Sequence, residues 1–135
     1  MAIRDKKLVV SNEQAITATA VSADKLDLNA AEDPGFGEGN AVRFVFQVET
    51  DFDHAHASDG TLTIQVAEAT AENLTTNQNI VVQSGAIPEA SLVKGFRLEL
   101  PVPAGDRLRF LGARYLVGGT GDFVAGRAHA WFEAL

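Results

Sequence analysis

Residues 107–135 read RLRFLGARYLVGGTGDFVAGRAHAWFEAL, and this stretch decides the fold. Aromatic and branched side chains fill both halves of it, as a pleated and half-buried surface prefers. Between the halves, residues 118–122 (GGTGD) tolerate positive φ where the chain must reverse. The stretch therefore predicts a long strand, a glycine-rich reversal and a second long strand that closes a sheet.

Gly112 interrupts the first of these two strands. Beyond it the apolar side chains change face, because Ala113, Tyr115 and Val117 share the parity of Leu111 rather than that of the residues before it. An extra residue in one strand produces such a change of face. We therefore expect a β-bulge at Gly112.

Trp131 is the unusual residue of the last strand. Alternation places it with Arg127, His129 and Glu133, on the polar face rather than on the apolar one. One hypothesis is that it is the floor of a second apolar layer or the edge of the same core. The other is that it anchors a subunit interface, where tryptophan is enriched.

Earlier parts of the chain repeat the strand pattern. Alternation is clearest at residues 42–49 and 61–67, and shorter runs follow the same rule at 25–28, 80–83 and 96–100. Turn signals separate these runs every 8 to 12 residues or so, as in sandwiches and jelly rolls. We expect an all-β protein, with residues 1–135 forming one antiparallel β-sandwich of jelly-roll type and about eight strands.

Residues 1–24 differ from the rest because, after a short apolar run at 8–10, they carry mostly small or polar side chains. They are expected to form an extended N-terminal arm or an edge strand of the domain. Small side chains also suit close packing against a second subunit, and that alternative stays open.

Composition excludes several kinds of partner. The 135 residues include 11 Lys and Arg against 18 Asp and Glu, which gives a net charge of −7. Phosphate binding depends on Lys and Arg, so we expect neither nucleic acid nor an anionic membrane as the partner. The chain has no cysteine, which removes disulfides and thiolate metal sites. No apolar run approaches the ~18 residues of a membrane span.

Residues 50–60 are expected to form a loop and hold the densest set of ligand side chains, between Asp51 and Asp59. His54 and His56 lie two residues apart, so they point to one side of an extended chain. Both imidazoles with the carboxylate of Asp53 would suit zinc or a similar ion. The alternative is a plain connection, since Asp and His are ordinary loop residues.

No catalytic motif stands out. The chain lacks a G-x-S-x-G elbow, a Walker motif and any cysteine nucleophile, and its carboxylates follow no recognisable frame. We therefore expect a protein that is not an enzyme and that needs no cofactor.

Two segments resemble a known family. Residues 8–17 (LVVSNEQAIT), 18–22 (ATAVS) and 26–28 (LDL) are similar to the opening of small capsid cement, or decoration, proteins of tailed bacteriophages. The end of the chain resembles them too, at residues 114–119 (RYLVGG), 123–126 (FVAG) and 128–130 (AHA).

The resemblance implies a jelly roll that forms a homo-dimer or homo-trimer on the outer capsid surface of the virion, after assembly in the host cytoplasm. Its partners would be itself and the major capsid protein, whose neighbouring subunits it would bridge. The interface residues that we expect are Val10, Ile16, Thr17, Tyr115 and Trp131. Two alternatives remain: a carbohydrate- or metal-dependent binding module on the same fold, and a cupin-like enzyme.

Overall fold

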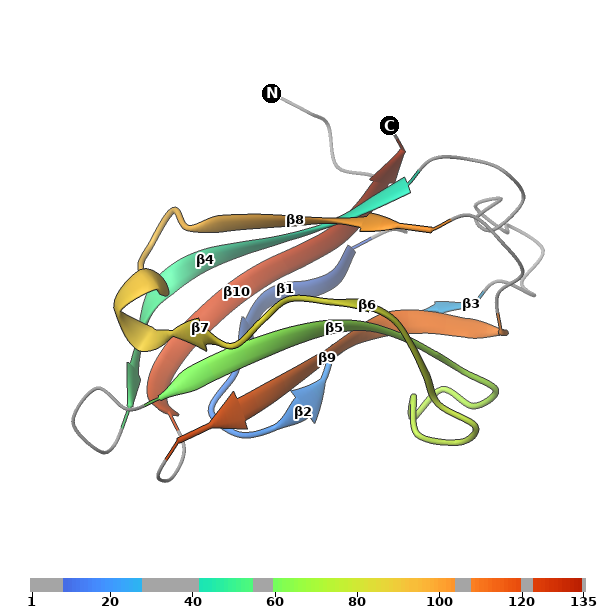
Figure 1. Ribbon diagram of the computed structural model, residues 1–135, viewed down its shortest axis with the longest axis horizontal. Coiled ribbons are helices and arrows are strands. Elements are labelled where there is room, and N and C mark those ends of the chain that lie inside the picture. The colour runs from blue at the N-terminus through green and yellow to red at the C-terminus, as the bar shows by residue number, and fades with distance from the viewer. Residues whose placement is uncertain (1–8, 28–41, 55–59, 104–107, 120–122, 135) are drawn as a thin grey trace.

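Two antiparallel sheets face each other in the computed structural model, which describes residues 9–27, 42–54, 60–103, 108–119 and 123–134 (Figure 1). The elements in this part of the chain are β1 (Val9–Ala15), β2 (Ala20–Val21), β3 (Leu26–Asp27), β4 (Val42–His54), β5 (Thr61–Ala69), β6 (Asn79–Gln83), β7 (Ile87–Pro88), the 3₁₀ turn η2 (Glu89–Ser91), β8 (Arg97–Val102), β9 (Phe110–Gly118) and β10 (Phe123–Ala134). The prediction of an all-β antiparallel sandwich is confirmed, with ten described strands, three of them only two residues long, instead of about eight.

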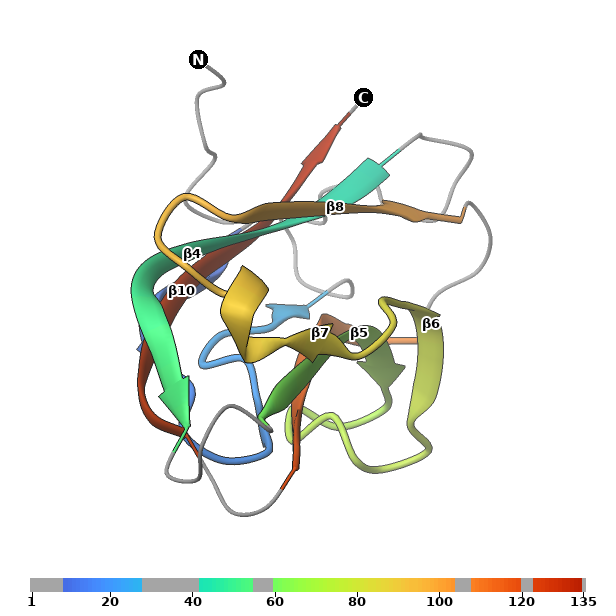
Figure 2. The same cartoon turned by 60° about the vertical axis from the view of Figure 1, so that its left-hand side comes forward.

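The strand order separates the two long C-terminal strands. One sheet has the order β1-β10-β4-β8, and the other has β2-β9-β5-β6, with β3 also paired to β9 and β7 to β5. The reversal after β9 therefore carries the chain from one sheet to the other, and β9 and β10 do not form a hairpin. Figure 2 shows that β4 and β10 bend together around the core.

The core lies between the inner faces of the two sheets. Phe44 and Phe132 pack together with ring centroids 5.0 Å apart in the sheet that contains β10. Phe46 of the same sheet reaches Tyr115 of the other, at 5.6 Å between centroids. All four side chains are fully buried. Tilted aromatic pairs of this kind add to the stability that burial itself provides.

The predicted bulge at Gly112 is wrong. β9 pairs with β5 over nine consecutive residue pairs without a register shift. Gly112 faces outward, where a Cβ atom would lie 2.8 Å from Leu74 Cδ1 and 3.0 Å from Ser22 Oγ. Leu74 is fully buried there, outside the main core. The glycine is thus needed for the close approach of the segment between β5 and β6, not for a change of face.

The expected loop at residues 50–60 begins later than predicted. β4 continues to His54, because β10 pairs with it at Thr50, Asp53 and His54. Phe52 keeps the alternation: its side chain is buried and meets Phe123 edge to face, with centroids 5.1 Å apart. In the sequence, the charged and polar residues on either side of Phe52 concealed that it faces inward.

The first and last described strands lie side by side. β1 is an edge strand and pairs with β10, while β2 pairs with β9 (Figure 1). The strands described between residues 9 and 27 therefore lie against the two long C-terminal strands. No helix in the described residues is long and apolar enough to cross a membrane.

Candidate functional site

Ser11, buried at the middle of β1, links the two sheets. Its Oγ lies 2.7 Å from the Tyr115 hydroxyl and donates to Gln14 Oε1, also at 2.7 Å. Because the single Ser11 hydroxyl proton goes to Gln14, the Tyr115 hydroxyl donates to Ser11. Gln14 then donates to the Val21 carbonyl at 3.0 Å and accepts from the Ala23 N–H at 2.8 Å. A continuous chain of hydrogen bonds therefore runs from the core to residues 21–23.

The environment of Tyr115 suits a structural role. Burial raises the pKa of Tyr115 well above its ordinary value. The phenol therefore stays neutral through the physiological range and acts as a hydrogen-bond donor. It is not a group that exchanges protons near neutral pH.

Glu13 has an unusual backbone in the same strand. Its φ is +48°, a left-handed conformation that costs a residue with a side chain about 1–2 kcal/mol. It lies between Ser11 and Gln14, where the register of β1 against β10 shifts. Two side chains of β10 hold this backbone: His129 Nδ1 accepts its N–H at 3.2 Å, and Arg127 donates to its carbonyl at 3.2 Å.

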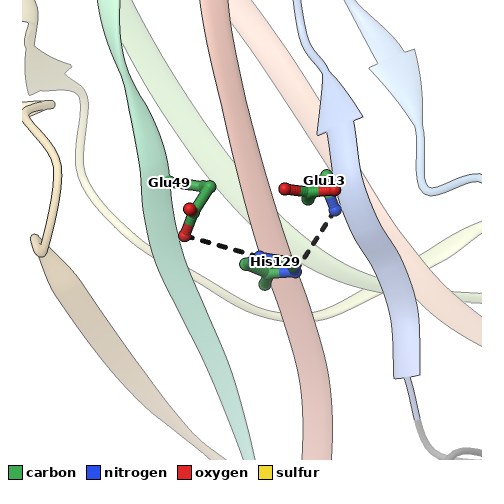
Figure 3. A group of neighbouring side chains, drawn as sticks. All are labelled: Glu13, Glu49 and His129. Atoms are coloured by element: carbon green, nitrogen blue, oxygen red, sulfur yellow. Dashed lines mark hydrogen bonds and ion pairs between the residues drawn. The ribbon is translucent and has the colours of Figure 1, made fainter.

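Glu13, Glu49 and His129 form a group that we call the His129 cluster (Figure 3). The residues come from three neighbouring strands, β1, β4 and β10. His129 Nε2 lies 3.6 Å from Glu49 Oε2, and one ligand atom of each residue lies within 4.8 Å of the others. The imidazole is only 15% exposed, whereas the two carboxylates are more open to solvent.

The hydrogen bonds of the cluster argue against a bound cation in this arrangement. A neutral imidazole has one protonated nitrogen and one lone pair. The lone pair of His129 is on Nδ1 and accepts from Glu13, so the proton is on Nε2, facing Glu49. A cation would need one of these nitrogens free. The cluster is therefore best described as a histidine that joins three strands.

Four of the five predicted interface residues are inside the protomer. Val10, Ile16 and Tyr115 are fully buried, and Trp131 is 5% exposed. They pack within a single chain, so the expectation that these side chains form a subunit contact is corrected. Thr17 alone is exposed. The apolar residues among them looked like interface anchors because the sequence does not reveal which strands cover them.

Trp131 belongs to a small apolar layer on the outer face of the four-stranded sheet. Val45, which broke the alternation of β4, is fully buried and directly opposite Trp131. Arg97 covers the indole, with its guanidinium carbon 5.5 Å from the ring centroid. Arg43 and Arg97 both reach Glu133, at 2.9 and 3.5 Å. The arrangement agrees with the hypothesis of a second apolar layer, which charged side chains cover.

The Bbp16 family model matches residues 10–132. The chain belongs to the Bbp16 family. The match begins in β1 and ends in β10, so it includes the hydrogen-bonded chain through Ser11 and the whole His129 cluster. No curated protein matches the chain.

The alternatives for the candidate ligands Asp53, His54 and His56, a metal site or a plain connection, both stay predictions. Asp53 and His54 lie at the end of β4, where Asp53 is exposed, and His56 falls outside the described residues. Nearby, Asp51 accepts the backbone N–H of Lys94 at 2.7 Å, so this carboxylate fixes the turn before β8.

The residues that attach β1 were not predicted from the sequence. The polar side chains at residues 11–14 do not resemble the apolar alternation of the other strands, yet these residues continue β1. One signal was present: four polar residues at 11–14 follow directly on the apolar run at 8–10. Nothing in the sequence indicated the positive φ of Glu13, which depends on side chains more than a hundred positions away.

Proposed function

We propose that this Bbp16 family member is a structural virion protein that binds the outer surface of an assembled capsid and bridges neighbouring major capsid protein subunits. One observation carries the proposal. The two segments that resemble capsid cement proteins are far apart in sequence, yet β1 pairs with β10 and β2 with β9. The resemblance therefore falls on one continuous region of the fold instead of two unrelated fragments.

We also infer that the sandwich is a jelly roll. β2 and β3 both lie along β9, and β6 and β7 both lie along β5, so each couple fills one strand position. With these couples merged, the sheets have the orders 1-8-3-6 and 2-7-4-5. This order supports a jelly roll, in which the chain passes repeatedly between two four-stranded sheets.

The proposed contact with the capsid is the end of the sandwich that carries Val93 and Val124. These are the exposed large apolar side chains of the described residues, at 47% and 61%. Phe123 donates its N–H to the Thr17 carbonyl at 2.9 Å, which places the exposed Thr17 beside Val124. Phe52 packs on Phe123 and donates its N–H to the residue before Val93, so both valines belong to one end.

Other surfaces are less suited to this contact. The outer face of the four-stranded sheet carries mutually neutralising ion pairs over Trp131. The segment that contains Leu74 covers part of the outer face of the other sheet. A protein that binds the assembled shell and not its free subunits stabilises the shell by mass action. Self-association would strengthen each attachment through avidity.

The test is co-sedimentation of the purified protein with mature capsids that lack it. We expect binding, and we expect Val124→Asp and Val93→Asp each to reduce it at least tenfold, the effect of about 1.4 kcal/mol. Thr75→Asp is the matched control, since Thr75 is exposed in the segment between β5 and β6 at the opposite end of the sandwich (Figure 1). Absence of binding by the wild-type protein overturns the proposal.

Self-association is measured separately, by sedimentation equilibrium at low protein concentration. A dimer or trimer is the expected species. A monomer that still binds capsids would remove the oligomer from the proposal and leave the capsid contact in place.

A further inference from the structure

We propose that His129 makes the attachment of the edge strand β1 dependent on pH. The neutral ring accepts the Glu13 N–H on Nδ1 at 3.2 Å. An imidazolium carries protons on both nitrogens and accepts no hydrogen bond. Protonation therefore removes the acceptor and sets a ring N–H against the backbone N–H of Glu13.

Acidic side chains surround His129 and would stabilise a protonated ring. Glu49 of β4 faces Nε2 at 3.6 Å, and the Glu13 carboxylate of β1 belongs to the same cluster. On β10 itself, Arg127 is occupied by the Glu13 carbonyl at 3.2 Å, and the cross-strand neighbour on β4 is the neutral Gln47. A protonated ring thus faces two carboxylates, while the backbone N–H of Glu13 loses its acceptor.

The consequence for β1 is local. Glu13 has a strained φ of +48°, and its backbone is held by His129 and Arg127. Loss of the His129 bond leaves Arg127 to hold it alone, while the buried bond between Ser11 and Tyr115 is unaffected. The irregular part of β1 therefore loosens in acid without unfolding the sandwich, as local opening reactions do. This property belongs to the free chain and does not rest on the capsid proposal.

The experiment is amide hydrogen exchange by NMR on the full chain at pH 8 and pH 5, corrected for the intrinsic dependence on pH. We expect the protection of the Glu13 amide to fall roughly fivefold in acid, the factor carried by one net hydrogen bond. Nitrogen-15 shifts of the His129 ring at pH 8 should report the tautomer protonated on Nε2. Protection at Tyr115 should stay constant.

Two kinds of variant isolate the ring. His129→Asn retains a neutral acceptor near the place of Nδ1 and does not titrate, so Glu13 protection should no longer depend on pH. The double variant of His54→Asn and His56→Asn removes the other two histidines of the chain and should leave the acid effect intact. The proposal is overturned if wild-type protection is independent of pH, if His129→Asn keeps the acid effect, or if the ring at pH 8 is protonated on Nδ1. The tautomer of the wild-type His129 ring, read from its nitrogen-15 shifts, tests the proposal even if a variant does not fold.

Discussion

The two edges of the four-stranded sheet are built differently. β8 pairs six residues with β4 without a register shift, and Arg97 and Glu99 point outward from it. β1 pairs four residues with β10, shifts register twice and contains the left-handed Glu13. What β1 lacks in regular backbone pairing is replaced by side-chain bonds from β9 and β10.

This difference between the two edges indicates where the loss of a single side chain changes the stability most. A regular ladder spreads its strength over many equivalent backbone bonds, so loss of one exposed side chain changes little. An irregular strand depends on a few specific bonds, some of them buried, and a buried group left without a partner is costly. Substitutions that touch β1 should therefore exceed those that touch β8.

Gly126→Ala should have the largest effect. Gly126 accepts the Ile16 N–H at 3.1 Å, next to the end of β1, and has φ +143°. A Cβ atom there would lie 2.6 Å from the Phe52 ring. Overpacking and backbone strain together should lower the free energy of unfolding by about 2–4 kcal/mol, measured by urea denaturation. Gly85→Ala is the control, because a Cβ atom at that position would have nothing within 4 Å, and an equal loss in both variants would contradict the steric explanation.

Ser11→Ala should come second, at about 1–3 kcal/mol, because it leaves the buried Tyr115 hydroxyl without its acceptor. Tyr115→Phe should cost less, since Ser11 keeps its bond to Gln14. Urea denaturation of both single variants and of the double variant measures the coupling between the two side chains. Strictly additive losses would show that the Ser11–Tyr115 bond does not hold β1.

Alkaline pH provides a third test. The pKa of Tyr115 is raised by burial, so the unfolded chain loses the phenol proton first. The stability associated with this shift is fully present below about pH 10, the ordinary phenol value, and falls as the pH rises above it. Tyr115 is the single tyrosine, so tyrosinate absorbance should appear together with unfolding. Tyr115→Phe should remove this contribution to alkaline unfolding, and tyrosinate absorbance in a folded wild-type protein near pH 10 would refute the assignment.

Glu133→Gln should have the smallest effect of the four. Glu133 pairs with Arg43 and Arg97 over the outer face next to β8, with its side chain 17% exposed. Partly exposed ion pairs contribute about 0.5–1 kcal/mol and weaken with salt. Thermal denaturation at low and high salt measures this contribution, with the more exposed Glu99→Gln as control. A loss of stability greater than that of Ser11→Ala would contradict the conclusion that β1 depends on single side chains more than β8 does.

Alternation in the sequence predicted much of the fold because each strand with one buried face carries its own local signal. β4, β5, β8, β9 and β10 were found in this way, apart from their ends. The attachments of β1 could not be found, since Ser11 and Tyr115 are 104 positions apart and Glu13 and His129 are 116 apart. Such contacts depend on strand order and register, which no local pattern contains.

Gly112 illustrates the same limit. Its sequence context predicted a bulge because the apolar side chains change face beyond it, as an extra residue in a strand would cause. The actual reason lies outside the strand, in the close approach of Leu74 and Ser22. Only the path of the segment between β5 and β6 distinguishes the two explanations.

The antiparallel pairing of the first and last described strands also determines how the protein responds to tension. Val9 pairs with Trp131, so the start of β1 and the final residues of β10 emerge at the same end of the sheet (Figure 1). A force that pulls the start of β1 away from the end of β10 acts first on the pair of Val9 and Trp131. It then breaks the backbone pairs between β1 and β10 one after another. A load spread across the strands would instead shear all the pairs together. Tension applied between the start of β1 and the end of β10 is therefore expected to release β1 before the rest of the sandwich.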